Sequence, residues 1–212
     1  MRSHFDEQLT LLNKELIEMG GLCETIIALA FKAFDDKSIR KSKEVNRLDN
    51  EIIQKERTIE SLCLKLLLQQ QPVAKDLRLI SAALKMIYDM KRIGDIALDI
   101  FEITAEENKN NESVMFHDMS LIAAMMVTKS VNAFVNSDII LAEEVIGDDD
   151  MLDNYFFEIR QELIRQITQN PEKGQYILDL LMVAKYLEKI GDHAVNISNW
   201  VIFSISGQHK EE

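Results

Sequence analysis

A helical segment occurs twice in this sequence. Residues 89–100 read DMKRIGDIALDI and residues 186–197 read YLEKIGDHAVNI, so the triplet IGD recurs after roughly 100 residues. A proline stands at a similar distance before each triplet, at Pro72 and at Pro171. A period of this length exceeds that of solenoid repeats and is typical of a duplicated domain. The chain is therefore expected to consist of two similar halves.

Glycine and proline, which turns and strands need often, are scarce, with 7 glycines and 2 prolines in 212 residues. Apolar residues recur at helical spacing, for example at Leu48 and Ile52. Both observations predict an all-α fold of two tandem similar three-helix bundles, with six long antiparallel helices and short links. The polar stretch ENKNNES at 107–113 divides the chain into a first repeat, 1–109, and a second, 110–212. The predicted helices span residues 3–34, 38–69, 73–107, 114–138, 141–168 and 172–206.

The charge and the cysteines exclude several classes of protein. A net charge of −12 argues against nucleic acid as a partner, because affinity for it comes mainly from Lys and Arg that neutralise phosphates. The basic run KSIRKSKEVNR at 37–47 is interpreted as a solvated helix start rather than a binding patch. Cys23 and Cys63 have apolar neighbours and are expected to be reduced core thiols, not a disulfide.

The sequence also bears on membrane location. The N-terminus, MRSHFDEQ, has no apolar signal region. The longest apolar run, LIAAMMV at 121–127, is shorter than the about 20 apolar residues that a bilayer span needs. We predict a cytoplasmic protein that associates with a membrane only through its partners.

The last predicted helix carries two carboxylates beside the repeated glycine. Glu188 and Asp192 are one helical turn apart, so their side chains are neighbours. Glu188 projects within the apolar stripe of the helix and Asp192 at its edge. Such carboxylates repel each other and lose hydration, so protonation, a Lys or Arg partner, or a cation must compensate. Gly191 costs about 1 kcal/mol of helix propensity relative to Ala, which indicates close packing or a site.

The middle helix of the second half offers another pair with the same spacing, Asp149 and Asp153. Two such pairs on adjacent helices could converge into one all-oxygen site. That ligand set suits a divalent metal or iron (Fe, Zn, Mn or Mg). The alternative is that each pair is ordinary solvated helix surface, and spacing alone favours this alternative in a chain so acidic.

Other chemistry leaves little trace in the sequence. None of the four histidines has a glutamate three residues before it, so the Glu-x-x-His pairs of di-iron carboxylate bundles are absent. His193 points to a different side of its helix from Glu188, and we expect it to be exposed or to lie behind the site. The sequence contains no Cys–His zinc spacing, phosphate-binding glycine loop or serine nucleophile motif.

The combination of QQPVAKDLR, KRIGD and EKIGDHAVNI resembles the PhoU family of phosphate-signalling regulators, over essentially the whole chain. The resemblance implies two similar three-helix bundles side by side and a role that is not enzymatic. It implies a negative regulator of the phosphate-starvation response. The partners it implies are the ATPase subunit of a phosphate ABC transporter and a sensor histidine kinase.

The resemblance also implies metal sites at a carboxylate motif, Glu or Asp followed four positions later by Asp. This motif occurs on the middle and last helices of each half in the family. In the second half Asp149 and Asp153 match the first motif, and Glu188 and Asp192 match the second. These four residues are the expected metal ligands.

The first half departs from the motif. Asp49 matches, but Ile53 stands where the second acid would be. Asp95 matches, but its partner position is Lys91, and Asp99 offers a substitute acid one turn later. A lysine ammonium beside Asp95 supplies the charge that a metal would otherwise supply. We therefore expect a lost or weakened metal site in the first half.

Two other functions stay open at this point. One is a metal-carboxylate enzyme, either an oxidase or a phosphatase, although the sequence identifies no nucleophile or base for it. The other is a structural helical bundle that binds no ligand. A homodimer is also open, because the long faces of helical bundles often pair.

Overall fold

The computed structural model describes residues 2–33, 43–69, 73–106 and 114–208, and these residues form helices and their connections. The predicted all-α fold with six helices is therefore confirmed. The helices are α1 (Arg2–Lys32), α2 (Glu44–Gln69), α3 (Ala74–Glu106), α4 (Val114–Asn136), α5 (Ile139–Gln169) and α6 (Gly174–Ser206), with a 3-10 turn, η2 (Pro171–Lys173), before α6.

The helix boundaries follow the predicted ones except at the start of α2. Lys43 lies outside that helix, so the start predicted at residue 38 is wrong. The helix begins at Glu44, an acid whose charge interacts favourably with the helix dipole in the first turn. Residues 38–42 themselves, Pro72 and the proposed boundary at 107–113 lie outside the described residues.

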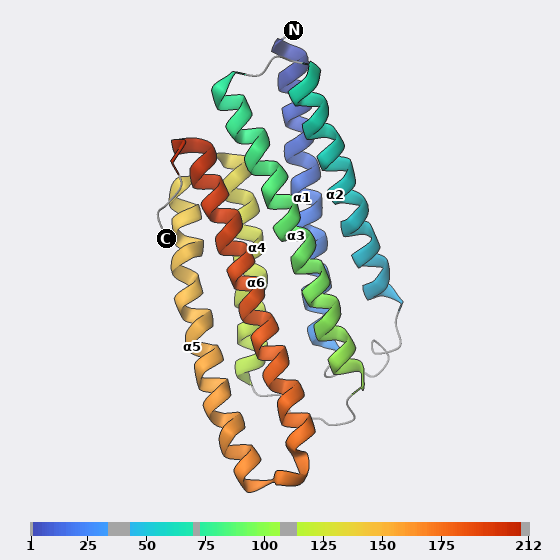
Figure 1. Cartoon of the computed structure of the whole chain (residues 1–212), viewed down its shortest axis with the longest axis vertical. Coiled ribbons are helices and arrows are strands. Elements are labelled where there is room, and N and C mark those ends of the chain that lie inside the picture. The colour runs from blue at the N-terminus through green and yellow to red at the C-terminus, as the bar shows by residue number, and fades with distance from the viewer. Residues whose placement is uncertain (1, 34–42, 70–72, 107–113, 209–212) are drawn as a thin grey trace.

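The six helices form two bundles of three. In the first, α1, α2 and α3 contact one another, and in the second, α4, α5 and α6 do the same. Figure 1 shows the bundles side by side, with α3 and α6 antiparallel where they meet. Behind them α1 packs against α4. The end of α2 and the start of α3 lie at one end of the molecule, and the end of α5 and the start of α6 lie at the other, so the two halves are related by an approximate rotation (Figure 1).

The cores are apolar and match the sequence pattern. Leu48 and Ile52 are buried, as their spacing predicts. Cys23 and Cys63 are free and buried, and burial raises the pKa of both thiols to about 12. They are the reduced core thiols that the sequence indicated.

One segment of α4, Met115–Asn136, is long and apolar enough to cross a membrane, although the short run at 121–127 did not predict this. Half of that segment is buried inside the protein, where α4 contacts α1, α5 and α6. The same helix therefore serves as a core helix of the second bundle. The other helices in the described ranges do not meet the same criteria.

Candidate functional site

α5 and α6 approach each other closely at Gly191. A Cβ atom added there would lie 2.4 Å from Leu152 Cδ2 and 2.9 Å from Asp149 Oδ1, both on α5. The missing side chain therefore lets the Asp149 carboxylate reach the surface of α6. Close packing, which we predicted as one reason for this glycine, is what the structure shows.

The four acids expected as ligands lie in one neighbourhood. Glu188 is buried, with 9% of its surface exposed, while Asp192 is at the edge of the helix face. Burial, and after it the charges of Asp153, Asp192, Glu188 and Asp150, together raise the pKa of Asp149 to about 6. The charges of the other three expected ligands thus all act on the partly buried carboxyl group of Asp149.

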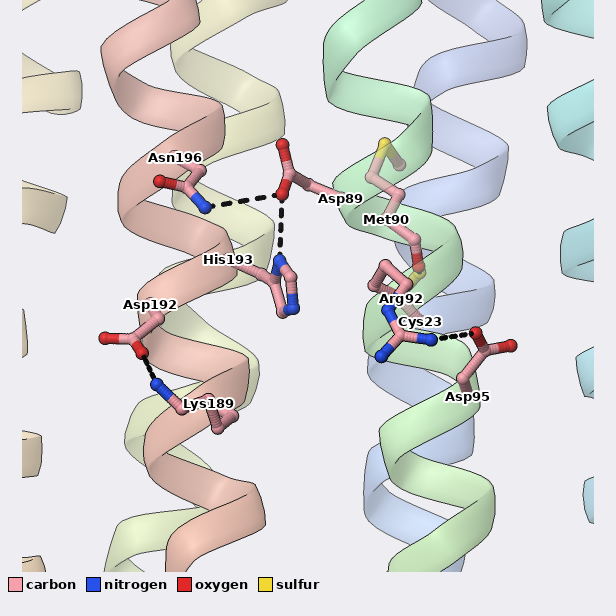
Figure 2. Close-up of polar contacts among 9 residues, drawn as sticks. All are labelled: Cys23, Asp89, Met90, Arg92, Asp95, Lys189, Asp192, His193 and Asn196. Atoms are coloured by element: carbon pink, nitrogen blue, oxygen red, sulfur yellow. Dashed lines mark hydrogen bonds and ion pairs between the residues drawn. The ribbon is translucent and has the colours of Figure 1, made fainter.

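Two lysines of α6 compensate part of this charge. Lys185 Nζ lies 2.6 Å from Glu188 Oε2, in an ion pair without the geometry of a hydrogen bond. Lys189 Nζ donates to Asp192 Oδ2, as Figure 2 shows, and lies 3.8 Å from Glu188 Oε2. Asp149 Oδ1, by contrast, is buried and has no hydrogen-bond partner. The lysines therefore leave the Asp149 carboxylate uncompensated.

These features bear on the expected metal. In the part of the chain that the structure describes, no three His, Cys, Asp or Glu side chains stand close enough together to hold an ion. The donor chemistry nevertheless fits a hard cation, because Asp149 presents a buried oxygen without a partner beside the recess at Gly191. Metal binding by Asp149, Asp153, Glu188 and Asp192 stays a prediction.

The first half repeats the same helix contact. A Cβ atom at Gly94 of α3 would lie 3.0 Å from Ile52 Cδ1 and 3.8 Å from Asp49 Oδ1, both on α2. Asp49 Oδ1 is also buried without a hydrogen-bond partner. Glycine, apolar residue and aspartate thus occupy equivalent places in the two halves.

The charges around this contact differ from those in the second half. Lys91 Nζ donates to Asp95 Oδ2 at 2.7 Å, and Arg92 Nη1 donates to the same oxygen at 3.0 Å. Burial raises the pKa of Asp49, Asp95 raises it further, and Lys91 opposes both. Lys91 therefore pairs with Asp95, as the sequence predicted. Ile53 adds no carboxylate to this group.

A polar contact joins the two halves where α3 meets α6. His193 Nδ1 lies 2.8 Å from Asp89 Oδ1, and Asn196 Nδ2 donates to the same oxygen at 3.4 Å (Figure 2). Asp89 is buried, with 7% of its surface exposed. His193, which we expected to be exposed or behind the carboxylates, thus bridges to the other half.

A second contact across this seam uses the same positions of the repeat. Burial raises the pKa of the Tyr186 phenol, and Asp99 adds to the shift through its charge and a hydrogen bond. Asp99, proposed as a substitute acid beside Asp95, therefore contacts the other half. When the halves are aligned on their IGD triplets, Asp89 corresponds to Tyr186 and Asp99 corresponds to Asn196. The Asp89–Asn196 and Tyr186–Asp99 contacts therefore use the same two positions, with the halves interchanged. Our sequence reasoning missed Asp89, whose only signal was an acid among apolar neighbours.

The fold and these contacts define a tandem helical-bundle protein with carboxylates gathered beside a glycine in each half. The sequence model of the PhoU domain matches residues 16–104 and 116–201, one match in each bundle. The chain belongs to the PhoU family.

Similar proteins cover nearly the whole chain. A phosphate-specific transport system accessory protein PhoU homolog from Pseudomonas aeruginosa is 31% identical over 207 residues, covering 96% of this chain and 86% of the relative. A homolog of the same description from Clostridium acetobutylicum is 30% identical, covering 98% and 96%.

Solved structures agree with the fold. The crystal structure of PhoU from Pseudomonas aeruginosa has a TM-score of 0.89 and 31% identity, covering 96% of this chain and 100% of that chain. The phosphate transport system regulatory protein PhoU from Streptococcus pneumoniae has a TM-score of 0.88 at 22% identity, covering 98% and 100%. The second similarity concerns the fold alone.

Proposed function

We propose that this chain is a cytoplasmic adaptor that restrains the phosphate-starvation response. It links the ATPase subunit of a phosphate ABC transporter to a sensor histidine kinase and catalyses no reaction itself. The observation that carries the proposal is the match, over 96% of the chain, to a relative described as an accessory protein of phosphate-specific transport. Association with the membrane then follows from the partners.

A pull-down from membranes of phosphate-replete cells tests the adaptor function. The tagged full chain should recover both the transporter ATPase and the sensor kinase, and the tag alone should recover neither. Recovery of neither partner by the full chain would overturn the proposal. Oxygen consumption with ferrous iron and phosphatase turnover, measured on the purified chain, should both stay at background. Turnover in either assay would favour the enzyme instead.

We propose further that the second half binds a metal cation through Asp149, Asp153, Glu188 and Asp192. Their side chains would draw closer together on binding than they stand in the structure. The unpaired Asp149 oxygen and the recess at Gly191 support this assignment. A bound dication would supply positive charge at a group of carboxylates that two lysines compensate only in part. Its role would be to hold α5 and α6 together at this surface.

The metal content of the purified chain, after incubation with Fe, Zn, Mn or Mg and dialysis, tests the assignment. Asp192→Ala should lose the bound metal, whereas Asp95→Ala in the first half should retain it. Helix content by circular dichroism checks that both variants fold. Unchanged metal in Asp192→Ala would refute the second-half site, and an equal loss in Asp95→Ala would refute the difference between halves.

A further inference from the structure

The last turns of α2 and the start of α3 expose apolar side chains at the end of the molecule that also holds the N-terminus (Figure 1). Leu68 is 84% exposed, more than any other large apolar residue in the described ranges. Leu64, one turn before it, and Val73 and Leu77, one turn apart, are each 43–55% exposed. We call these four residues the apolar tip. Single exposed apolar residues are ordinary, but a group of them around one helix connection is a feature of interaction surfaces.

The cations beside the apolar tip are not neutralised by ion pairs. No ion pair or side-chain hydrogen bond within the described ranges engages Lys65, Lys75 or Arg78, and Arg78 Nε is buried without a partner. Asp76 is the one acid between Lys65 and Arg78 in the sequence, and its Oδ2 accepts a hydrogen bond from the Val73 backbone N–H at 3.2 Å. This stretch therefore carries three cations against one acid, in a chain whose net charge is −12.

The other acids at this end of the molecule lie on different turns or on a different helix. Glu60, the acid before this stretch in the sequence, is on α2 one turn before Leu64. Asp6 and Glu7 are in the first turns of α1, which runs behind α3 (Figure 1). Because these acids form no ion pair with the three cations, charge complementarity favours an anionic occupant at the apolar tip.

The second half shows that the fold does not require the apolar tip. When α2 is aligned with α5 on Asp49 and Asp149, and α3 with α6 on the IGD triplets, the four tip residues correspond to Ile164, Thr168, Asn170 and Gly174. Ile164 is the one large apolar residue among these four. The same connection between a middle and a last helix is thus mostly polar in the second half.

The cations differ between the halves in the same way. Lys75 corresponds to Glu172, and Arg78 corresponds to Gln175. Lys65 corresponds to Arg165, whose Nη2 lies 2.7 Å from Glu162 Oε2 in an ion pair. Exposed apolar side chains and unpaired cations therefore occur together at the first connection and not at the second, so they serve something other than the fold.

We propose that the apolar tip inserts into the anionic phospholipid surface of a membrane. Its four apolar side chains would enter the boundary between headgroups and acyl chains, while Lys65, Lys75 and Arg78 would meet the lipid phosphates. A nucleic acid would offer phosphates but no apolar phase for Leu68.

The sequence predicts membrane association only through partners, and this contact would be a direct one in addition to theirs. A small apolar surface with a few cations binds lipid weakly and reversibly, so a second attachment is needed for stable binding. The inference goes beyond the proposed adaptor function and does not depend on the identity of the partners.

Cosedimentation of the purified full chain with vesicles tests the apolar part of the contact. The vesicles contain equal parts of phosphatidylglycerol and phosphatidylcholine, and binding should be weaker to phosphatidylcholine alone. Leu68→Ser with Leu77→Ser should weaken binding to the anionic vesicles about tenfold or more. The matched control, Ile164→Ser with Leu178→Ser, removes two exposed apolar side chains from the second half and should leave binding unchanged. Equal weakening by both pairs would overturn the proposal.

Charge provides the second comparison. Lys65→Gln with Lys75→Gln should weaken binding to the anionic vesicles about tenfold, because each lysine near such a surface adds to the attraction. Arg57→Gln with Lys173→Gln removes the same charge from cations that also have no ion pair in the described ranges, and it should leave binding unchanged. Equal weakening by both pairs would show that net charge alone decides binding. Circular dichroism checks that all variants fold.

A fluorescent label reports where the apolar tip lies. Leu68→Cys can be labelled selectively with an environment-sensitive NBD group, because Cys23 and Cys63 are buried. Its emission should shift to shorter wavelength when anionic vesicles are added, and the same label at Ile164→Cys should not shift. If the chain sediments with the vesicles without a shift at Leu68→Cys, another surface binds the lipid and the proposal is wrong.

Two results would assign the apolar tip to another occupant and overturn the proposal. A shift of the label at Leu68→Cys that grows with protein concentration in the absence of vesicles would show that a second copy covers the tip. Loss of the transporter ATPase or the kinase from the pull-down by Leu68→Ser with Leu77→Ser, with vesicle binding unchanged, would show a protein partner there. The vesicle assay uses only the purified chain, so its failure would leave the adaptor function standing, and a failed pull-down would leave the lipid contact standing.

Discussion

In both halves an aspartate of the middle helix points at a glycine of the last helix, but the surrounding charges differ. In the first half Asp49 and Asp95 share their surroundings with Lys91 and Arg92. In the second half, among the described residues, Lys185 and Lys189 are the cations paired with the four carboxylates. The first group is balanced by its own side chains. The second lacks two positive charges, which is the charge of a divalent cation.

The comparison shows how a duplicated motif can diverge without a change of fold. In each half the last helix packs closely on the middle helix at a glycine, Gly94 or Gly191. The glycine is retained because a side chain there would meet the middle helix. Charge is less constrained, because these side chains lie at the margin of the core. A lysine at position 91, where the repeat has Glu188, changes the local charge by two units.

The strongest test of this comparison converts the first half into the second. Ile53→Asp with Lys91→Glu restores the carboxylate pattern around Asp49 and Asp95. We expect bound metal per chain to roughly double, because four carboxylates then share the charge of Arg92 alone among the residues paired with them. Metal analysis after dialysis measures it. Lys91→Glu alone is the control and should add less metal. An unchanged content in the double variant would show that charge alone does not explain the difference.

The glycines give the next largest effect. Gly191→Ala should destabilise the fold by about 1–2 kcal/mol, because the new methyl group overlaps Leu152 and Asp149 and outweighs the gain in helix propensity. Gly94→Ala should change stability by less than about 0.5 kcal/mol, since its closest contact would be the flexible end of the Ile52 side chain, at 3.0 Å. Urea denaturation compares them. Equal effects would mean that the two helix contacts are equally tight.

These glycines also show what the sequence predicted well. The IGD triplets and Pro171 predicted the duplicated helices, because helix packing leaves a local spacing in the sequence. The Lys91–Asp95 pair was predictable for the same reason, since it joins residues one turn apart.

Contacts between distant helices were not predictable in this way. Asp89 and His193 are far apart in the sequence and meet only because α3 and α6 pack across the seam. The contact between Lys55 of α2 and Glu15 of α1 likewise depends on how these two helices pack. No spacing within one helix reports such a contact, so only the three-dimensional structure shows it.

A third prediction concerns pH and the Asp149 carboxyl group in metal-free protein. Its pKa is raised from 3.8 to about 6 by burial and neighbouring acids, so the folded state holds this proton more tightly than the unfolded state. The stability it contributes is fully present below about pH 4 and is lost as pH rises through about 6. Asp149→Asn should abolish this pH dependence. Between pH 4.5 and 7 the wild type should lose about 1 kcal/mol relative to the variant, because solvent screening reduces the full effect.

Asp49→Asn is the matched control for this measurement. Burial and Asp95 raise the Asp49 pKa, but Lys91 opposes them, so the change in pH dependence should be smaller. Unfolding by urea with a chelator present, at several pH values, measures both variants. Equal changes in the two halves would contradict the difference in charge balance between them.

The smallest expected effect comes from removing single lysines. Lys91→Met should cost about 0.5–1 kcal/mol, because the Lys91–Asp95 pair is mostly shielded, with 29% and 25% of the two side chains exposed. Lys189→Met should cost less than about 0.5 kcal/mol, since the Lys189–Asp192 pair is more exposed, at 46% and 39%. A double-mutant cycle with Asp95→Asn isolates the first interaction, and Asp192→Asn isolates the second. If Lys189 proved the more important, the second half would already be balanced by its own lysines, and the case for a cation there would weaken.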